Sequence, residues 1–205
     1  MRTVLTLLAA FALACSAHAA EKFLEEHTAK ALAAGDPAAV VAALEREVSR
    51  NNVIAALELG RMYRDGKGLA VDYAKARRFL KVAAETDLVR LWYKLGVPAA
   101  QYALAVMLRD GVGGKADPSG AAAWFEEAAE LNYAPAQRAL AQMYFNGTKR
   151  DPERAFVWSS IAARSLDAAE KEEMDHIRDL SQKELKPQQL ARAGVVVGAW
   201  KPKAS

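Results

Sequence analysis

The sequence predicts an all-α protein built as a row of helix pairs, because one two-helix pattern occurs three times. The first half of the pattern aligns at spacings of 45 and 36 residues, in segments 55–66, 100–111 and 136–147. The second half starts at an aspartate, with an alanine 4, a large aromatic residue 7 and an alanine 11 positions later. Offsets of 4, 7 and 11 stay on one helical face, so each half is a helix with one apolar stripe.

Composition and charge narrow the class of protein. The chain has 205 residues, of which 52% are hydrophobic and 26% charged, which is ordinary for a globular protein. A net charge of +3 is too balanced for a dedicated nucleic-acid binder. No apolar run reaches the roughly 18 residues that a membrane-spanning helix needs. The single cysteine excludes an intramolecular disulfide and a cysteine-based zinc site.

The N-terminus has the layout of a signal peptide, which we assign to residues 1–19. Arg2 is followed by an apolar run from Val4 to Cys15, and Ala17-His18-Ala19 fits the small-x-small rule for cleavage. We therefore expect a periplasmic or secreted protein, cleaved near Ala19. The alternative is a lipoprotein anchored through Cys15, although that position usually follows a large aliphatic residue and here has Ala12 three positions before it.

Residues 20–52 are interpreted as a degenerate helix pair that caps the first repeat. Asp36-Pro37 resembles the start of a second helix, and 19 residues separate Asp36 from Ala55, as they separate Asp117 from Ala136. The end of a repeat array needs a polar outer face to stay soluble.

The three repeats, at about 53–86, 98–131 and 134–165, have residues with clear mechanical roles. A glycine stands where each first helix must stop, because glycine tolerates the left-handed conformation found there; these are Gly66, Gly111 and Gly147. An aspartate caps each second helix, namely Asp72, Asp117 and Asp151. The large residue expected to fill the space between helices is Phe79, Trp124 or Trp158.

The combined pattern, A-x-x-x-L-G-x-x-Y-x-x-G, a short loop, Asp and then A-x-x-W-x-x-x-A-A, resembles the Sel-1-like repeat family of tetratricopeptide-like helical solenoids. The resemblance implies a right-handed α-solenoid of antiparallel helix pairs that acts as an adaptor for other proteins. The second repeat departs from the pattern at Ala105 and Leu108, and the third at Ala141. Some secreted members are rich in cysteine, which this chain is not, so no activity of that subgroup is carried over.

One insertion, at residues 86–98, interrupts the period. It contains Trp92 and Tyr93 among other apolar residues. It is either an extended second helix that packs on its neighbour or an exposed aromatic patch for a partner. After the repeats, residues 166–205 are expected to form C-terminal capping helices, the last starting at Pro187, for about ten helices in all.

No catalytic, cofactor or metal site is expected. Glu173-x-x-His176 is half of a carboxylate-bridged metal motif, but it occurs once, in a helix full of surface charge. Neither His27 nor His176 lies in a catalytic motif. The loop from Asp110 to Lys115 lacks the strand and the Ser or Thr of a phosphate-binding loop, and it corresponds to the loop between the helices of the first repeat.

A partner surface is predicted on the first helix of each repeat, because the family resemblance implies that this helix lines the concave face. Leu59, Met62 and Tyr63 are expected to point into the core. The opposite side then has Leu57 and the following positions, which include no acidic residue: Arg61, Arg64, Tyr102, Val106, Arg109, Arg138, Gln142 and Phe145. Arginine beside aromatic residues suits an acidic peptide or an acidic envelope polymer. The alternative is a solvated surface that Asp65, Asp110 and Glu58 neutralise.

The sequence thus predicts a non-catalytic protein–protein interaction scaffold in the bacterial periplasm or cell envelope, whose partner is a protein, an acidic peptide or an acidic polymer. The alternative is an envelope hydrolase acting on cell-wall material, which the lack of an acid–base constellation disfavours.

Overall fold

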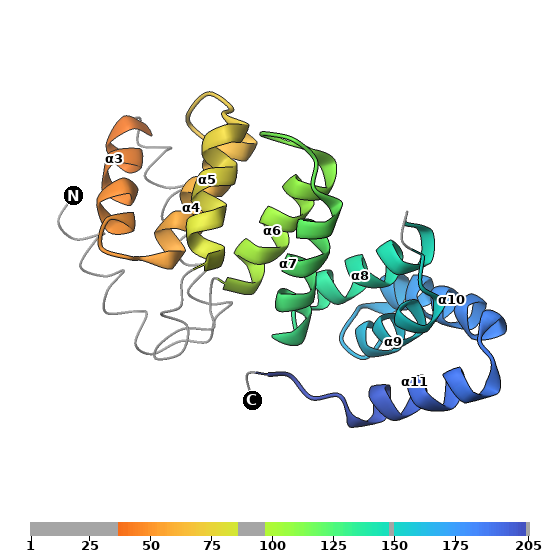
Figure 1. The fold of residues 1–205 in the computed structure, drawn as a ribbon. Coiled ribbons are helices and arrows are strands. Elements are labelled where there is room, and N and C mark those ends of the chain that lie inside the picture. The colour runs from red at the N-terminus through yellow and green to blue at the C-terminus, as the bar shows by residue number, and fades with distance from the viewer. Residues whose placement is uncertain (1–36, 86–96, 148–149, 204–205) are drawn as a thin grey trace. The chain divides into compact units, whose positions relative to one another are not determined.

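The computed structural model describes residues 37–85, 97–147 and 150–203, and these residues form nine α-helices and no strand (Figure 1). The helices are α3 (Pro37–Val48), α4 (Val53–Asp65), α5 (Tyr73–Glu85), α6 (Val97–Asp110), α7 (Pro118–Glu130), α8 (Ala134–Asn146), α9 (Pro152–Ala162), α10 (Ala168–Glu184) and α11 (Pro187–Ala199). The prediction of an all-α protein of repeated helix pairs is confirmed. The predicted signal peptide and residues 20–36 of the predicted N-terminal cap lie outside the described residues.

The chain divides into two compact units, residues 1–118 (unit 1) and 119–205 (unit 2), and each is described by itself. In unit 1, α4 packs against α3 and α5, and α5 packs against α6 (Figure 1). In unit 2, α9 packs against α8, α10 and α11. We call the first helix of each repeat the A helix (α4, α6 and α8) and the second the B helix (α5, α7 and α9).

The loops between A and B helices follow one design in all three repeats. The backbone N–H of the capping aspartate donates to a carbonyl near the end of the A helix: Asp72 to Tyr63, Asp117 to Leu108 and Asp151 to Tyr144, at 2.8–2.9 Å. Gly66 and Gly111 have φ of 69°, the left-handed conformation that their position requires. The expectation that Gly147 is left-handed is wrong: its φ is −79°, and the loop it begins is two residues shorter.

The core of unit 1 surrounds α4. Gly60 allows the close approach of α5, since a Cβ there would lie 2.7 Å from Leu80 Cγ. The rings of Tyr63 and Phe79 stack with their centroids 5.7 Å apart. Leu57, which the helical register placed on the partner surface, is instead 1% exposed. The reason is that α4 is buried on more than one side, since α3, α5 and α6 all pack against it.

The core of unit 2 differs from the prediction by one residue. Phe125 is fully buried, whereas Trp124, the expected core residue of α7, is only half-buried. A second cluster joins α8, α9 and α10, and Trp158 packs against it as expected; its buried members are Ala141, Ala155, Ala162, Met174 and Ile177. Core formation in unit 2 therefore depends on α10 as well as on the repeats.

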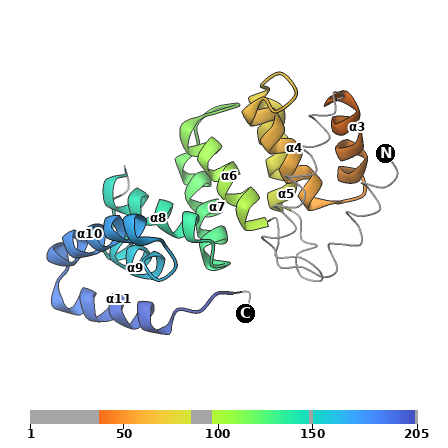
Figure 2. The ribbon, with the colours of Figure 1, turned by 180° about the vertical axis from the view of Figure 1, so that it is seen from behind.

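The last helix, α11, lies against α9 and is held at several points (Figures 1 and 2). Arg192 forms a two-bond ion pair with Glu153 of α9, at 2.7 and 2.5 Å. The chain then returns to the end of α7, where Lys203 contacts Glu130. One side of α11 stays in solvent, with Val195 71% exposed. Within the described ranges, no helix is long and apolar enough to cross a membrane.

Candidate interaction surface

The A helices of unit 1 end in the same arginine–aspartate pair. Arg64 donates to both carboxylate oxygens of Asp65, with Nε–Oδ1 at 2.7 Å and Nη2–Oδ2 at 3.0 Å. Arg109 binds Asp110 with the same atoms at the same distances. Both arginine side chains are more than a third exposed. Each A helix of unit 1 thus ends in one charge-assisted, two-bond pair.

These pairs keep both partners charged. The hydrogen bond from Arg64 lowers the pKa of Asp65, and the bond from Arg109 lowers the pKa of Asp110 in the same way. A guanidinium has five N–H groups, of which each aspartate uses two. Each arginine therefore keeps three N–H donors for a further acceptor, and its fork is already oriented by the aspartate.

Tyr102 of α6 lies near both pairs. Its phenol is close enough to Arg64 and to Arg109 to contribute to the electrostatic environment that raises the pKa of each. Arg61, one turn before Asp65, acts on that carboxylate as well. The structure thus brings four of the predicted residues of unit 1 into one surface, which we call the A-helix surface: Arg61, Arg64, Tyr102 and Arg109. Its acidic members are Asp65 and Asp110, adjacent in sequence to the predicted residues.

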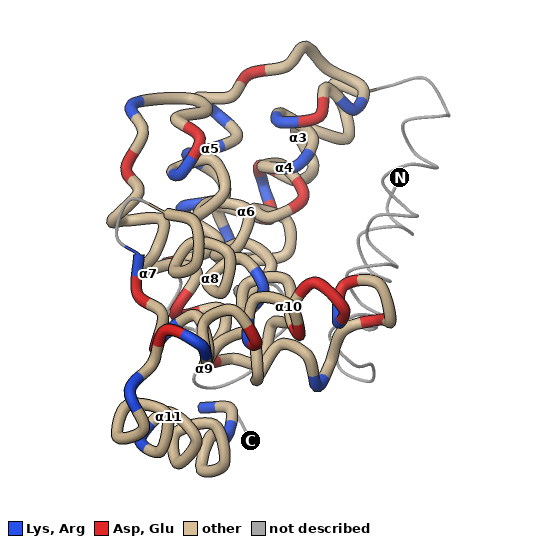
Figure 3. Tube along the Cα trace, turned by 90° about the vertical axis from the view of Figure 1, so that its right-hand side faces the viewer, with Lys and Arg blue, Asp and Glu red and all other residues tan. Residues whose placement is uncertain are grey.

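The predicted residues of unit 2 are used differently. Arg138 donates to Glu170 at 2.6 Å and to Glu173 at 2.9 Å, both on α10. Gln142 donates to Glu173 at 2.6 Å. Figure 3 shows α10 with acidic residues along its length. The third predicted residue, Phe145, packs against the buried cluster of α8, α9 and α10. All three residues are therefore engaged in contacts with the C-terminal cap, and we leave them out of the A-helix surface.

The remaining sequence candidates are only partly described by the structure. Trp92 and Tyr93 lie outside the described residues. His176 is exposed on α10, while the neighbouring Glu173 is engaged by Arg138 and Gln142. The glycine-rich loop after α6 packs on α5, where Arg77 Nη1 donates to the carbonyl of Lys115 at 3.1 Å.

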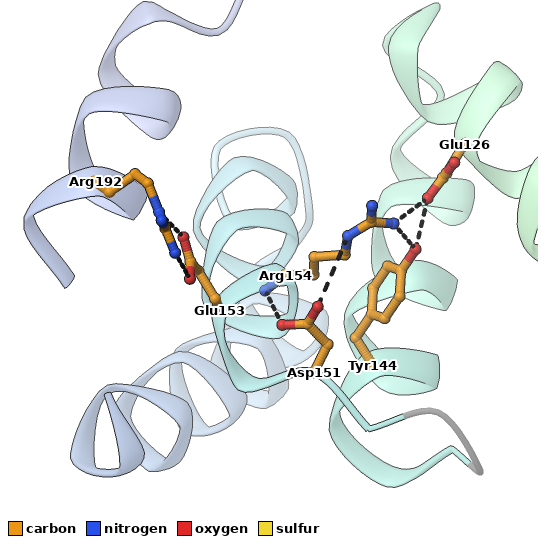
Figure 4. A network of polar contacts seen from close by, with 6 residues as sticks. All are labelled: Glu126, Tyr144, Asp151, Glu153, Arg154 and Arg192. Carbon is orange, nitrogen blue, oxygen red and sulfur yellow. Dashed lines mark hydrogen bonds and ion pairs between the residues drawn. The ribbon is translucent and has the colours of Figure 1, made fainter. Parts of the chain in front are cut away.

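One polar network was not predicted from the sequence. The Tyr144 hydroxyl donates to Glu126 at 2.5 Å, and Arg154 donates to both, at 2.6 and 2.8 Å (Figure 4). Burial, followed by the bond to Glu126, raises the pKa of Tyr144 to about 12. The guanidinium also lies over the Tyr144 ring at 5.2 Å. This network joins α7, α8 and α9, and we assign it a structural role.

Repeat 1 has a simpler version of this network, in which Lys75 lies over the Tyr63 ring at 5.0 Å. The second repeat has Leu108 and Gly120 at the two corresponding positions, so it lacks both partners. A tyrosine near the end of the A helix together with a cation two residues into the B helix is the sequence signal that could have identified the contact.

Comparison with known proteins identifies the family of these repeats. The sequence matches the Sel1 repeat family over residues 53–86, 98–133 and 134–165. It is 30% identical over 141 residues to alginate biosynthesis protein AlgK of Pseudomonas syringae pv. tomato, covering 68% of this chain and 27% of that protein. The chain thus spans about a quarter of that relative's length.

Two solved structures are also similar. A Sel1 repeat protein from Oxalobacter formigenes is 26% identical, with a TM-score of 0.49 over 58% of this chain and 45% of that one. The protective antigen c5321 of uropathogenic Escherichia coli, which has an SLR fold, is 23% identical, with a TM-score of 0.45 over 97% of this chain and 49% of that one.

Proposed function

Because the chain belongs to the Sel1 repeat family, we propose that it is a non-catalytic interaction scaffold of the bacterial cell envelope. Sel1 repeat proteins are generally protein-interaction scaffolds. The helix pairs are rigid elements that present side chains from successive repeats on one surface, and such surfaces are what repeat proteins use for binding.

The envelope location rests on the sequence of residues 1–19, which has the charge, the apolar run and the small-x-small site of a cleaved signal peptide. The intact mass of the native protein tests it. A chain that starts at Ala20 supports a periplasmic or secreted protein, a diacylated chain that starts at Cys15 supports a lipoprotein, and an unprocessed N-terminus contradicts both.

The observation that carries the binding proposal is the repeated, already oriented arginine at the end of both A helices of unit 1, Arg64 and Arg109, with Tyr102 near both. Oriented guanidiniums lose little conformational entropy on binding, and each still has free N–H donors for a carboxylate. An aromatic ring close to both supplies apolar contact at low entropic cost. The A-helix surface is therefore suited to an acidic partner.

Two sources of acidic partner fit this chemistry: an acidic segment of a protein and an acidic envelope polymer. The relative AlgK is named for the biosynthesis of alginate, a polymer of uronic acids, which supports the second source. Both are tested in one experiment, because they share the carboxylate.

The test measures binding of an oligoglutamate peptide and of alginate oligosaccharides to the full mature chain. Charge reversal at Arg64→Glu with Arg109→Glu should abolish binding, and raised salt should weaken wild-type binding. The matched control is Arg78→Glu with Lys81→Glu, which makes the same change of charge on the exposed side of α5. Undiminished binding by the first variant, or equal loss in both variants, would contradict the proposal. An unchanged melting temperature shows that the variants are folded.

A further inference from the structure

We propose that a groove at the start of unit 1 binds a partner segment in which an apolar side chain lies next to a cationic one. The groove has a volume of about 660 Å³, within the range of ligand sites, and opens to solvent. It lies between α3 and the loop from Gly66 to Asp72. Its apolar lining consists of Pro37, Ala38, Val41, Ala42, Leu69, Ala70 and Val71, and Tyr63, Gly68 and the charged residues Glu45, Asp72 and Lys75 complete it.

The corresponding contact one repeat later, between α5 and the loop after α6, is closed. There, the loop after α6 packs directly on α5: a Cβ on Gly113 would lie 2.3 Å from the Tyr73 carbonyl oxygen. Arg77 also donates to the carbonyl of Lys115 at 3.1 Å and holds the loop to the helix.

The residues at the equivalent positions explain the difference. Counted from the first helical residue, Val41 and Ala42 of α3 stand where α5 has Arg77 and Arg78. Neither side chain can donate a hydrogen bond to a loop carbonyl, so nothing ties the loop to α3 there. The loop itself has Leu69 and Val71 where the next loop has Gly114 and Ala116. The result is an apolar groove with Val71 49% exposed.

The charge at the rim selects the partner. Lys75 is paired with Asp72 at 3.7 Å, and Asp72 also accepts from the Lys75 backbone N–H as the cap of α5. The carboxylate of Glu45 has no hydrogen bond or ion pair in the described part of the chain. An apolar side chain in the groove with a cation beside Glu45 satisfies both features. This preference is opposite to that of the A-helix surface, so the two proposals can fail separately.

The test follows the methyl signals of the full mature chain by NMR while two probes of equal length are added, hexylammonium and hexanoate. Hexylammonium should shift the Val41, Leu69 and Val71 methyl signals at a concentration at least about fivefold lower than hexanoate does. Glu45→Gln should remove this preference and keep the shifts, while Glu47→Gln, the same change on the same helix outside the groove, should keep both.

Val41→Arg, which copies the closed contact, should abolish the shifts from both probes, while unchanged methyl signals of the α8–α10 cluster show that the chain is folded. The proposal is overturned if neither probe shifts these methyls, if hexanoate binds as well as hexylammonium, or if Val41→Arg leaves binding intact. Methyl contacts from Val41 to residues 20–36 or to a second copy of the chain would also overturn it, because they would show the groove to be filled.

Discussion

Units 1 and 2 repeat the same helix pair but use its polar A-helix positions in opposite ways. In unit 1, Arg64 and Arg109 pair with the next residue of their own helix and stay at the surface. In unit 2, Arg138 reaches over to carboxylates 32 and 35 residues further along, on α10. The comparison teaches that the A-helix side of a repeat stays exposed only where no further helix of the same chain covers it.

The largest expected losses of stability come from truncating the side chains that fill the core of each unit. Phe125→Ala should destabilise unit 2 by about 3–5 kcal/mol, because a fully buried aromatic ring is replaced by a cavity. Trp124→Ala should cost clearly less, because that side chain is half-buried. Leu80, the residue of α5 that corresponds to Phe125, is also fully buried, so Leu80→Ala should cost about 2–5 kcal/mol in unit 1.

Urea unfolding of the three variants measures these differences. A larger loss for Trp124→Ala than for Phe125→Ala would mean that the ring of Trp124, and not Phe125, occupies the core in solution.

The next prediction tests the difference between the two arginine arrangements. Glu173→Ala should cost about 1–2 kcal/mol, because it removes the acceptor of both Arg138 and Gln142 where α10 meets α8. Asp65→Ala should cost no more than about 0.5 kcal/mol, since exposed pairs contribute little. Amide hydrogen exchange should locate the Glu173→Ala effect in α10. Equal effects in the two variants would remove the contrast between the units.

The network around Tyr144 predicts a pH dependence in unit 2. An unfolded tyrosine loses its proton near pH 10, whereas the folded Tyr144 keeps it to about 12. Between these values the folded state holds more protons, so its contribution to stability is present below pH 10 and is lost as the pH rises toward 12. The Tyr144→Phe variant should lose less stability than wild type over this interval. Absorbance of tyrosinate in the wild type should show one late-titrating group that the variant lacks.

Local sequence features predicted the helix pairs well, because their causes are local. A glycine ends an A helix, an aspartate starts a B helix, and alanines at 4 and 11 positions mark the buried stripe; each acts within a few residues of itself. Helical spacing identifies the buried side of a helix but does not distinguish between adjacent residues at the edge of that side. It therefore predicted Trp124 as the core residue of α7, whereas the buried ring is that of its neighbour Phe125.

The candidate site was predicted less completely, because its details depend on distant contacts. Nothing near Arg138 in the sequence indicates that Glu170 will bind it. Nor does the pattern of α4 indicate that Leu57 is buried, since that follows from packing on several sides. The groove beside α3 likewise arises from two segments that are each unremarkable: a helix with Val41 and a loop with Leu69.

The smallest expected effects on stability come from replacing a helical glycine by alanine, and they should have opposite signs in the two units. In α4, a Cβ on Gly60 would lie 2.7 Å from Leu80 Cγ, so Gly60→Ala should overpack the core and destabilise unit 1. In α11, a Cβ on Gly194 meets nothing within 4 Å, so Gly194→Ala should stabilise unit 2 by about 0.5–1 kcal/mol through helix propensity alone. Urea midpoints measure both changes. A destabilised Gly194→Ala variant would contradict the structure, because it would require a segment or a partner to lie against the exposed side of α11 in solution.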